Sequence, residues 1–73
     1  MKPGDLLLAK SKYAGVVSIY TDDQCVFWET RMKKDDVVVL LEEQQNQWKQ
    51  DVLKVLFPPG IRWIYKIDLM VVT

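Results

Sequence analysis

The sequence FPPGIRWIYKIDL, residues 57–69, decides how this chain is expected to fold. Two prolines and a glycine stand between runs rich in β-branched and aromatic residues, which is typical of a tight reversal joining two strands. Pro59 suits the second position of such a turn, and Gly60 suits a positive φ after it. The segment Ile67–Leu69 is expected to form a single 3₁₀ turn. The stretch therefore predicts a hairpin followed by one short turn.

Further strands are expected where short apolar runs lie between polar clusters. The polar clusters Thr21–Gln24, Lys33–Asp36 and Gln44–Gln47 are expected to be turns or loops. The expected strands are Asp5–Ala9, Val16–Tyr20, Cys25–Trp28, Val37–Leu41, Trp48–Phe57, Ile61–Lys66 and Met70–Val72.

The segment from Asp35 to Lys54 has a second interpretation, because its many Glu and Gln residues tolerate a helix. The run Val37–Leu41 begins with three valines, whose stiff side chains disfavour a helix. We therefore favour a buried strand here over a helix. In the strand that follows, alternation predicts Leu53, Val55 and Phe57 on one face.

The bulk composition fits one small domain over residues 1–73. Ten basic residues balance ten acidic ones, so the chain lacks the basic excess typical of nucleic-acid binding. A single cysteine allows no internal disulfide. Neither a secretory signal nor an apolar run of membrane-spanning length is visible. We expect a cytoplasmic protein with no membrane partner.

The order of these elements resembles an SH3-like barrel over nearly the whole chain. Lys33–Asp36 would be the diverging turn and Pro58–Gly60 the distal turn. The resemblance implies an all-β fold, a small SH3-like barrel of five to seven short antiparallel strands with one 3₁₀ turn near the C-terminus. The motif Pro3–Leu6 and the block Val55–Val72 are similar to short SH3-like proteins of bacteriophages and bacteria, mostly of unassigned function.

This resemblance implies a phage-encoded protein, placed in the host-cell cytoplasm or in a virion. Signalling SH3 domains, by contrast, bind Pro-rich helices through a first-strand aromatic motif, a tyrosine in the 3₁₀ turn and a nearby proline. The corresponding positions here are Leu7–Lys10, Asp68 and Tyr65. These three departures argue against recognition of Pro-rich helices.

Catalytic chemistry has little material in this sequence. The chain contains no histidine, which removes His-based acid–base catalysis and most zinc sites. Adjacent acidic pairs such as Asp22-Asp23 point to opposite faces of an extended chain, so we interpret them as solvated charges. Cys25 has no basic neighbour to activate it and is expected to be a small buried hydrophobe. We therefore expect no enzymatic activity, no cofactor and no metal.

The aromatic residues exceed what one small core can hold, so some are expected on the surface. Exposed Trp or Tyr beside Arg is the composition of a protein-binding hot spot. The expected partner is therefore a protein, of the virion or of the host. The candidate binding residues are Arg62, Trp63, Tyr65, Trp48, Tyr13 and Trp28.

Two alternatives stay open at this stage. Trp63 with Arg62, Lys66 and Lys54 is also the composition of a nucleic-acid-binding barrel, although acidic residues are interleaved with them. A small stabilising subunit of a larger complex has the same sequence features as an interaction module. The sequence predicts neither the partner nor the oligomeric state.

Overall fold

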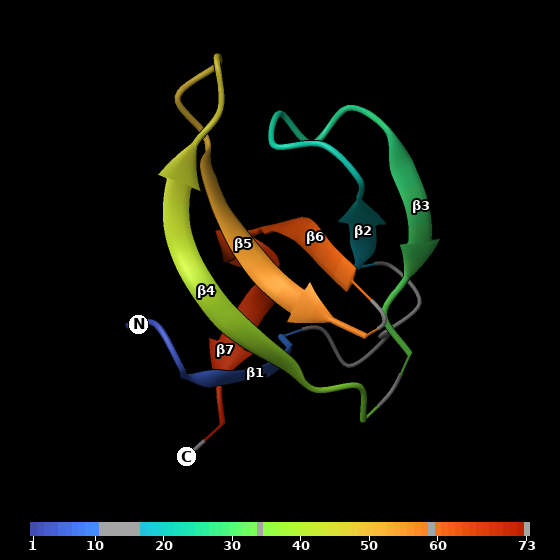
Figure 1. Cartoon of the computed structure of the whole chain (residues 1–73), viewed down its shortest axis with the longest axis vertical. Helices are drawn as coiled ribbons and strands as arrows, with labels where there is room; N and C mark the ends of the chain where they lie inside the picture. The colour runs from blue at the N-terminus through green and yellow to red at the C-terminus, as the bar shows by residue number, and fades with distance from the viewer. Residues whose placement is uncertain (11–16, 34, 59, 73) are drawn as a thin grey trace.

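The computed structural model describes residues 1–10, 17–33, 35–58 and 60–72 of the chain. In these residues the apolar runs form seven strands (Figure 1). The strands are β1 (Leu6–Ala9), β2 (Ser18–Tyr20), β3 (Trp28–Arg31), β4 (Val38–Gln45), β5 (Asp51–Phe57), β6 (Gly60–Tyr65) and β7 (Leu69–Val71). A 3₁₀ turn, η2 (Lys66–Asp68), connects β6 to β7. The described part of the chain contains no helix long and apolar enough to cross a membrane.

The seven strands form one antiparallel sheet in the order β3-β2-β6-β5-β4-β1-β7. The all-β class, the strand count and the 3₁₀ turn near the C-terminus are thereby confirmed, and the helix from Asp35 to Lys54 is wrong. The edges of the sheet are β3 and β7, which do not pair with each other in the described residues. The sheet is therefore open, and closure into a barrel is not part of the observed pairing.

One face of the curved sheet carries the core. Leu53 and Val55 lie in it as expected, and Phe57 packs against it. Val52 is also buried, although alternation along β5 places it on the face opposite to Leu53 and Val55. Its partner in the strand register is Tyr65 on β6. The buried core residues are Leu7, Val17, Ile19, Met32, Val38, Leu40, Leu53, Val55, Ile64 and Leu69.

The turn between β4 and β5 is organised by Asn46, the one buried polar residue among those described. Its side-chain oxygen accepts hydrogen bonds from the backbone N–H groups of Trp48 and Gln50, each at 3.0 Å. Its side-chain nitrogen donates to the carbonyl oxygen of Gln24, at 3.2 Å, in the loop between β2 and β3. Asn46 therefore closes its own hairpin and fastens a second one to it.

This turn lies later in the chain than expected. The predicted loop Gln44–Gln47 and the predicted strand Trp48–Phe57 are both wrong at their starts. Gln44 and Gln45 continue β4, paired with the first residues of β5, and the chain reverses over residues 46–50. The backbone N–H of Asn46 donates to the carbonyl oxygen of Gln50, which leaves residues 47–49 as the hairpin loop. Lys49 takes a positive φ of 60°, the conformation that the last residue of a three-residue hairpin loop needs.

The expected strand Cys25–Trp28 is also wrong over most of its length. The carboxylate of Asp22 accepts hydrogen bonds from the backbone N–H groups of Val26 and Phe27, which extends the loop to Phe27. Cys25 has a positive φ of 58°, which no strand residue adopts. The strand β3 therefore begins only at Trp28.

Gly60 has a different role from the expected one. It is the first residue of β6, pairs with Phe57, and is not among the residues with positive φ. Pro59 lies outside the described residues. A Cβ atom at Gly60 would stand 2.9 Å from Nη1 of Arg62, so the glycine leaves room for that guanidinium group. The reversal between β5 and β6 is confirmed, but without the positive φ expected of Gly60.

Smaller differences affect the ends of other strands. The 3₁₀ turn and the last strand each begin one residue earlier than expected, at Lys66 and Leu69. Val37 precedes β4 and is exposed, so the prediction of a wholly buried strand holds only for Val38 and Leu40. Val16 lies outside the described residues.

We expect Asn46→Ala to lower the free energy of unfolding by about 2 kcal/mol, because it leaves the partly buried backbone N–H groups of Trp48 and Gln50 without their acceptor. Urea denaturation followed by tryptophan fluorescence measures this. Gln45→Ala, one residue earlier and exposed, is the matched control and should cost less than about 0.5 kcal/mol. Equal losses in the two variants would contradict the role given to Asn46.

Candidate interaction surface

Trp63 and Tyr65 lie on the outward face of β6, half-buried. The indole nitrogen of Trp63 donates a hydrogen bond to Oε1 of Gln44 on β4, at 3.0 Å. The Tyr65 hydroxyl donates to Oε1 of Gln50, at 3.3 Å, and its ring meets Tyr20 edge-on with ring centroids 5.5 Å apart. Both aromatics are therefore held in place by hydrogen bonds to neighbouring side chains, and part of each ring stays exposed.

Arg62 is not beside Trp63 on that face, because neighbouring residues of a strand point to opposite sides. Its Nε donates to a carboxylate oxygen of Glu29 on β3, at 2.7 Å, and its Nη1 donates to the carbonyl oxygen of Ile61. The guanidinium group thus joins β6 to β3. Its charge is directed at Glu29, so the structure separates Arg62 from the Trp63–Tyr65 pair.

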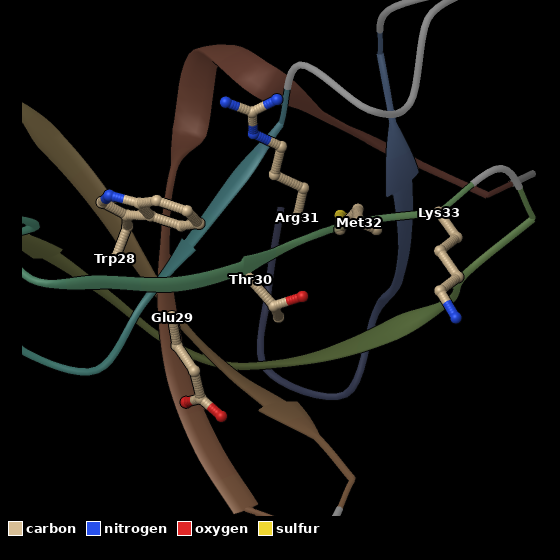
Figure 2. A pocket seen from close by; sticks show the side chains of 6 residues that line it. All are labelled: Trp28, Glu29, Thr30, Arg31, Met32 and Lys33. Atoms are coloured by element: carbon tan, nitrogen blue, oxygen red, sulfur yellow. The ribbon is translucent and has the colours of Figure 1, made fainter.

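Among the predicted binding residues that the structure describes, Trp28 is the most accessible, with 61% of its surface exposed. The register of β2 with β3 shifts at Glu29, so that Tyr20 pairs with Trp28 while Ile19 pairs with Thr30. This bulge brings Trp28 and Arg31 to the same side of β3 (Figure 2). The Arg31 guanidinium lies 5.8 Å from the centre of the Trp28 ring, within the range of a cation–π contact.

A shallow groove of about 550 Å³ follows this edge of the sheet. Its lining residues are Trp28, Glu29, Thr30, Arg31, Met32 and Lys33 (Figure 2). Because Glu29 is paired with Arg62, the remaining charges of the groove are the positive ones of Arg31 and Lys33. β3 pairs on one side only, with β2, in the described sheet. The groove therefore combines an exposed aromatic, positive charge and an edge strand.

Trp48 is not brought into this groove. Trp48 stands in the turn between β4 and β5 with 56% of its surface exposed, and Tyr13 lies outside the described residues. The predicted site thus divides into the half-buried pair on β6, the exposed Trp28 on β3 and the separate Trp48.

Phe27 was not among the predicted binding residues, although it directly precedes Trp28 and is 69% exposed. The sequence contains a signal for this residue, because the run CVFW places two large aromatics next to each other. The predicted strand Cys25–Trp28 placed Phe27 on one face and Trp28 on the other. The Asp22 loop places Phe27 before the strand begins, where nothing buries it.

The basic residues of the nucleic-acid alternative are largely committed to acidic partners. Arg62 is paired with Glu29, and Nζ of Lys66 lies 3.3 Å from a carboxylate oxygen of Glu43. Lys54 lies opposite Glu42 in the strand register, so a carboxylate stands on the neighbouring strand. These three cations therefore do not form a continuous positive strip for phosphates.

Cys25 is buried in the loop between β2 and β3, with its carbonyl oxygen 3.5 Å from the Tyr65 hydroxyl. Burial, reinforced by the charges of Asp22 and Asp23, raises the pKa of the Cys25 thiol to about 12. Burial likewise raises the pKa values of Tyr20 and Tyr65, with the neighbouring Cys25 as a further cause. The thiol is thus protonated near neutral pH and is a weak nucleophile.

Neither a cluster of metal ligands in the described residues nor a known relative adds to this geometry. In the described part of the chain, no three His, Cys, Asp or Glu residues are grouped as metal ligands. A scan against protein-family models and searches of curated proteins and of solved structures returned no match for the chain. The function of the chain is therefore inferred from its own sequence and geometry.

We expect the stability of the protein to fall between about pH 7 and pH 9.5, and to fall less in Cys25→Ala. An unfolded thiol ionises at about pH 8.5, whereas the folded thiol keeps its proton to a pKa of about 12. The stabilisation is present below the unfolded pKa and is lost as the pH rises. The difference between the two proteins should be about 1 kcal/mol at pH 9.5.

Urea denaturation at both pH values measures this difference. Alanine meets the same positive φ as cysteine at position 25, so the variant is a fair control for the backbone. Parallel loss of stability in both proteins would mean that the Cys25 thiol is not the group that titrates.

Proposed function

We propose that this chain is a non-enzymatic protein-interaction module with the architecture of an SH3-like barrel. The observation that carries the proposal is the exposed pair Phe27 and Trp28 at the start of an edge strand, with Arg31 against the Trp28 ring. Tryptophan and arginine are the residues most enriched in protein-binding hot spots. A monomeric surface gains nothing from exposing two large aromatics side by side in sequence.

The mode of binding that fits this edge is addition of an extended segment of the partner to β3. An edge strand offers unpaired backbone groups, and main-chain hydrogen bonds to them supply affinity without regard to sequence. Side chains then supply selectivity: an apolar partner residue would pack on Trp28, and an acidic one would face Arg31 and Lys33. The preferred partner segment is therefore extended, apolar in part and acidic.

The resemblance of Pro3–Leu6 and Val55–Val72 to short SH3-like phage proteins supports an accessory role in a virion or the binding of a host protein. A non-enzymatic role is supported by the lack of histidine and by the protonated Cys25 thiol. The paired state of Arg62 and Lys66 favours a protein partner over nucleic acid.

We expect Trp28→Ala to weaken partner binding by about 2 kcal/mol or more, a loss of roughly thirtyfold, with little effect on folding. Extended peptides selected from a random display library against the wild-type protein serve as probes. Fluorescence anisotropy of a labelled peptide measures the Kd. Trp48→Ala, which removes an equally exposed tryptophan from a different site, should bind as the wild type does.

Two results would contradict the proposal. Selected peptides that bind Trp28→Ala as tightly as the wild type would place the binding site elsewhere. Micromolar binding of single-stranded DNA or RNA with a steep dependence on salt would make nucleic acid the partner class, since each neutralised phosphate releases a counterion.

A further inference from the structure

A second outward surface of the sheet, carried by strands other than β3, is entirely aliphatic. Its members share the side of their strands opposite to the core, as alternation along each strand requires. They are Leu6, Leu8, Val37, Val39, Leu56, Ile61, Met70 and Val72, which we call the aliphatic face.

The pairing register makes the aliphatic face continuous across five strands. Ile61 lies opposite Leu56, Leu56 opposite Val39, and Val39 opposite Leu6. The backbone N–H of Val72 donates to the carbonyl oxygen of Leu6, which places β7 at the end of this row. Such cross-strand neighbours have Cβ atoms about 5 Å apart, so their side chains touch.

A second row runs beside the first. Leu8 lies opposite Met70, and Val37 stands two residues before Val39 on the same side of the chain. Figure 1 shows β7, β1 and the start of β4 next to one another, as the register requires. No charged side chain interrupts either row.

The extent of the aliphatic face corresponds to an interface rather than to scattered surface residues. Six of its residues are 40–47% exposed, within a total accessible surface of 4907 Å². At roughly 80 Å² for each of them, they present on the order of 500 Å² of apolar surface, near the upper limit for a typical monomer. No described residue of this chain covers it.

We propose that the aliphatic face is the interface of a homodimer, occupied by a second copy of this chain. A standard interface buries about 800 Å² on each partner, of which about 65% is apolar in homodimers, or roughly 500 Å². The aliphatic face supplies this area. A purely aliphatic surface also complements itself, because each copy presents the same uncharged side chains across a two-fold axis.

The charges at the border of the aliphatic face favour the same occupant. Charged residues close to this face along the chain include Lys10 just after β1, Asp35 before β4 and Lys54 on β5. Both signs are present, so a two-fold axis can oppose basic and acidic groups of the two copies. A partner of strong single charge would meet repulsion from half of this border.

Sedimentation equilibrium of the wild-type protein over the micromolar range tests the proposal. We expect a species of twice the 8.6 kDa chain mass. Leu56→Lys, inside the longer row between Ile61 and Val39, should weaken dimerisation at least a hundredfold while circular dichroism shows an unchanged β spectrum. Ile67→Lys is the matched control, since Ile67 is more exposed than any of these residues but lies outside the aliphatic face.

The outcomes separate cleanly. A dimer that Leu56→Lys dissociates and Ile67→Lys leaves intact supports the proposal. A wild-type monomer at these concentrations overturns it, whatever else is found to bind there, and so does a Leu56→Lys variant that still dimerises. If Leu56→Lys does not fold, Met70→Lys at the edge strand β7 takes its place, with the same expectation.

Discussion

A single sheet that curves around one core has only one inner face, and this constraint governs how the chain distributes its apolar residues. The core occupies that face with residues from all parts of the sheet, including Leu7, Leu40 and Ile64. Apolar side chains at the alternate positions must then lie outward. In a sheet with two covered faces they would be buried by a second layer, but the described chain supplies none. Its outward apolar residues therefore become candidate contacts with other molecules.

The outward face divides into regions of different chemistry. Around β6 and β2 the aromatics bond to neighbours, as Trp63 does to Gln44, and so form part of the folded structure. At β3 the aromatics Phe27 and Trp28 have no such cover. A third region, the aliphatic face, extends over β1, β7, the start of β4 and the adjoining ends of β5 and β6. A dimer through the aliphatic face would carry two β3 grooves, and two linked grooves bind a repetitive partner more tightly than one because the second attachment is intramolecular.

The sequence predicted the strands and the core well where the signal was local. The alternation in β5 placed Leu53 and Val55 inward, and the Pro-Pro-Gly step marked the reversal before β6. It failed where a side chain reorganises the backbone. The Asp22 carboxylate holds Val26 and Phe27 in a loop, and Asn46 delays the reversal after β4. The exposure of Val37 could not be predicted without knowing that no second layer covers the outward face next to β4. The ion pair of Arg62 with Glu29 could not be predicted without the order of the strands in the sheet.

The position of β1 between β4 and β7 affects the order in which the chain can fold. Strands β4, β5 and β6 are consecutive and joined by short turns, so their pairing closes only small loops. Both neighbours of β1 lie far along the chain, so Leu6–Leu8 find no strand partner until much of the protein has left the ribosome. Early apolar segments that wait for distant partners are the ones that chaperones bind. The strand β1 is thus among the last of the seven described strands to be sheltered.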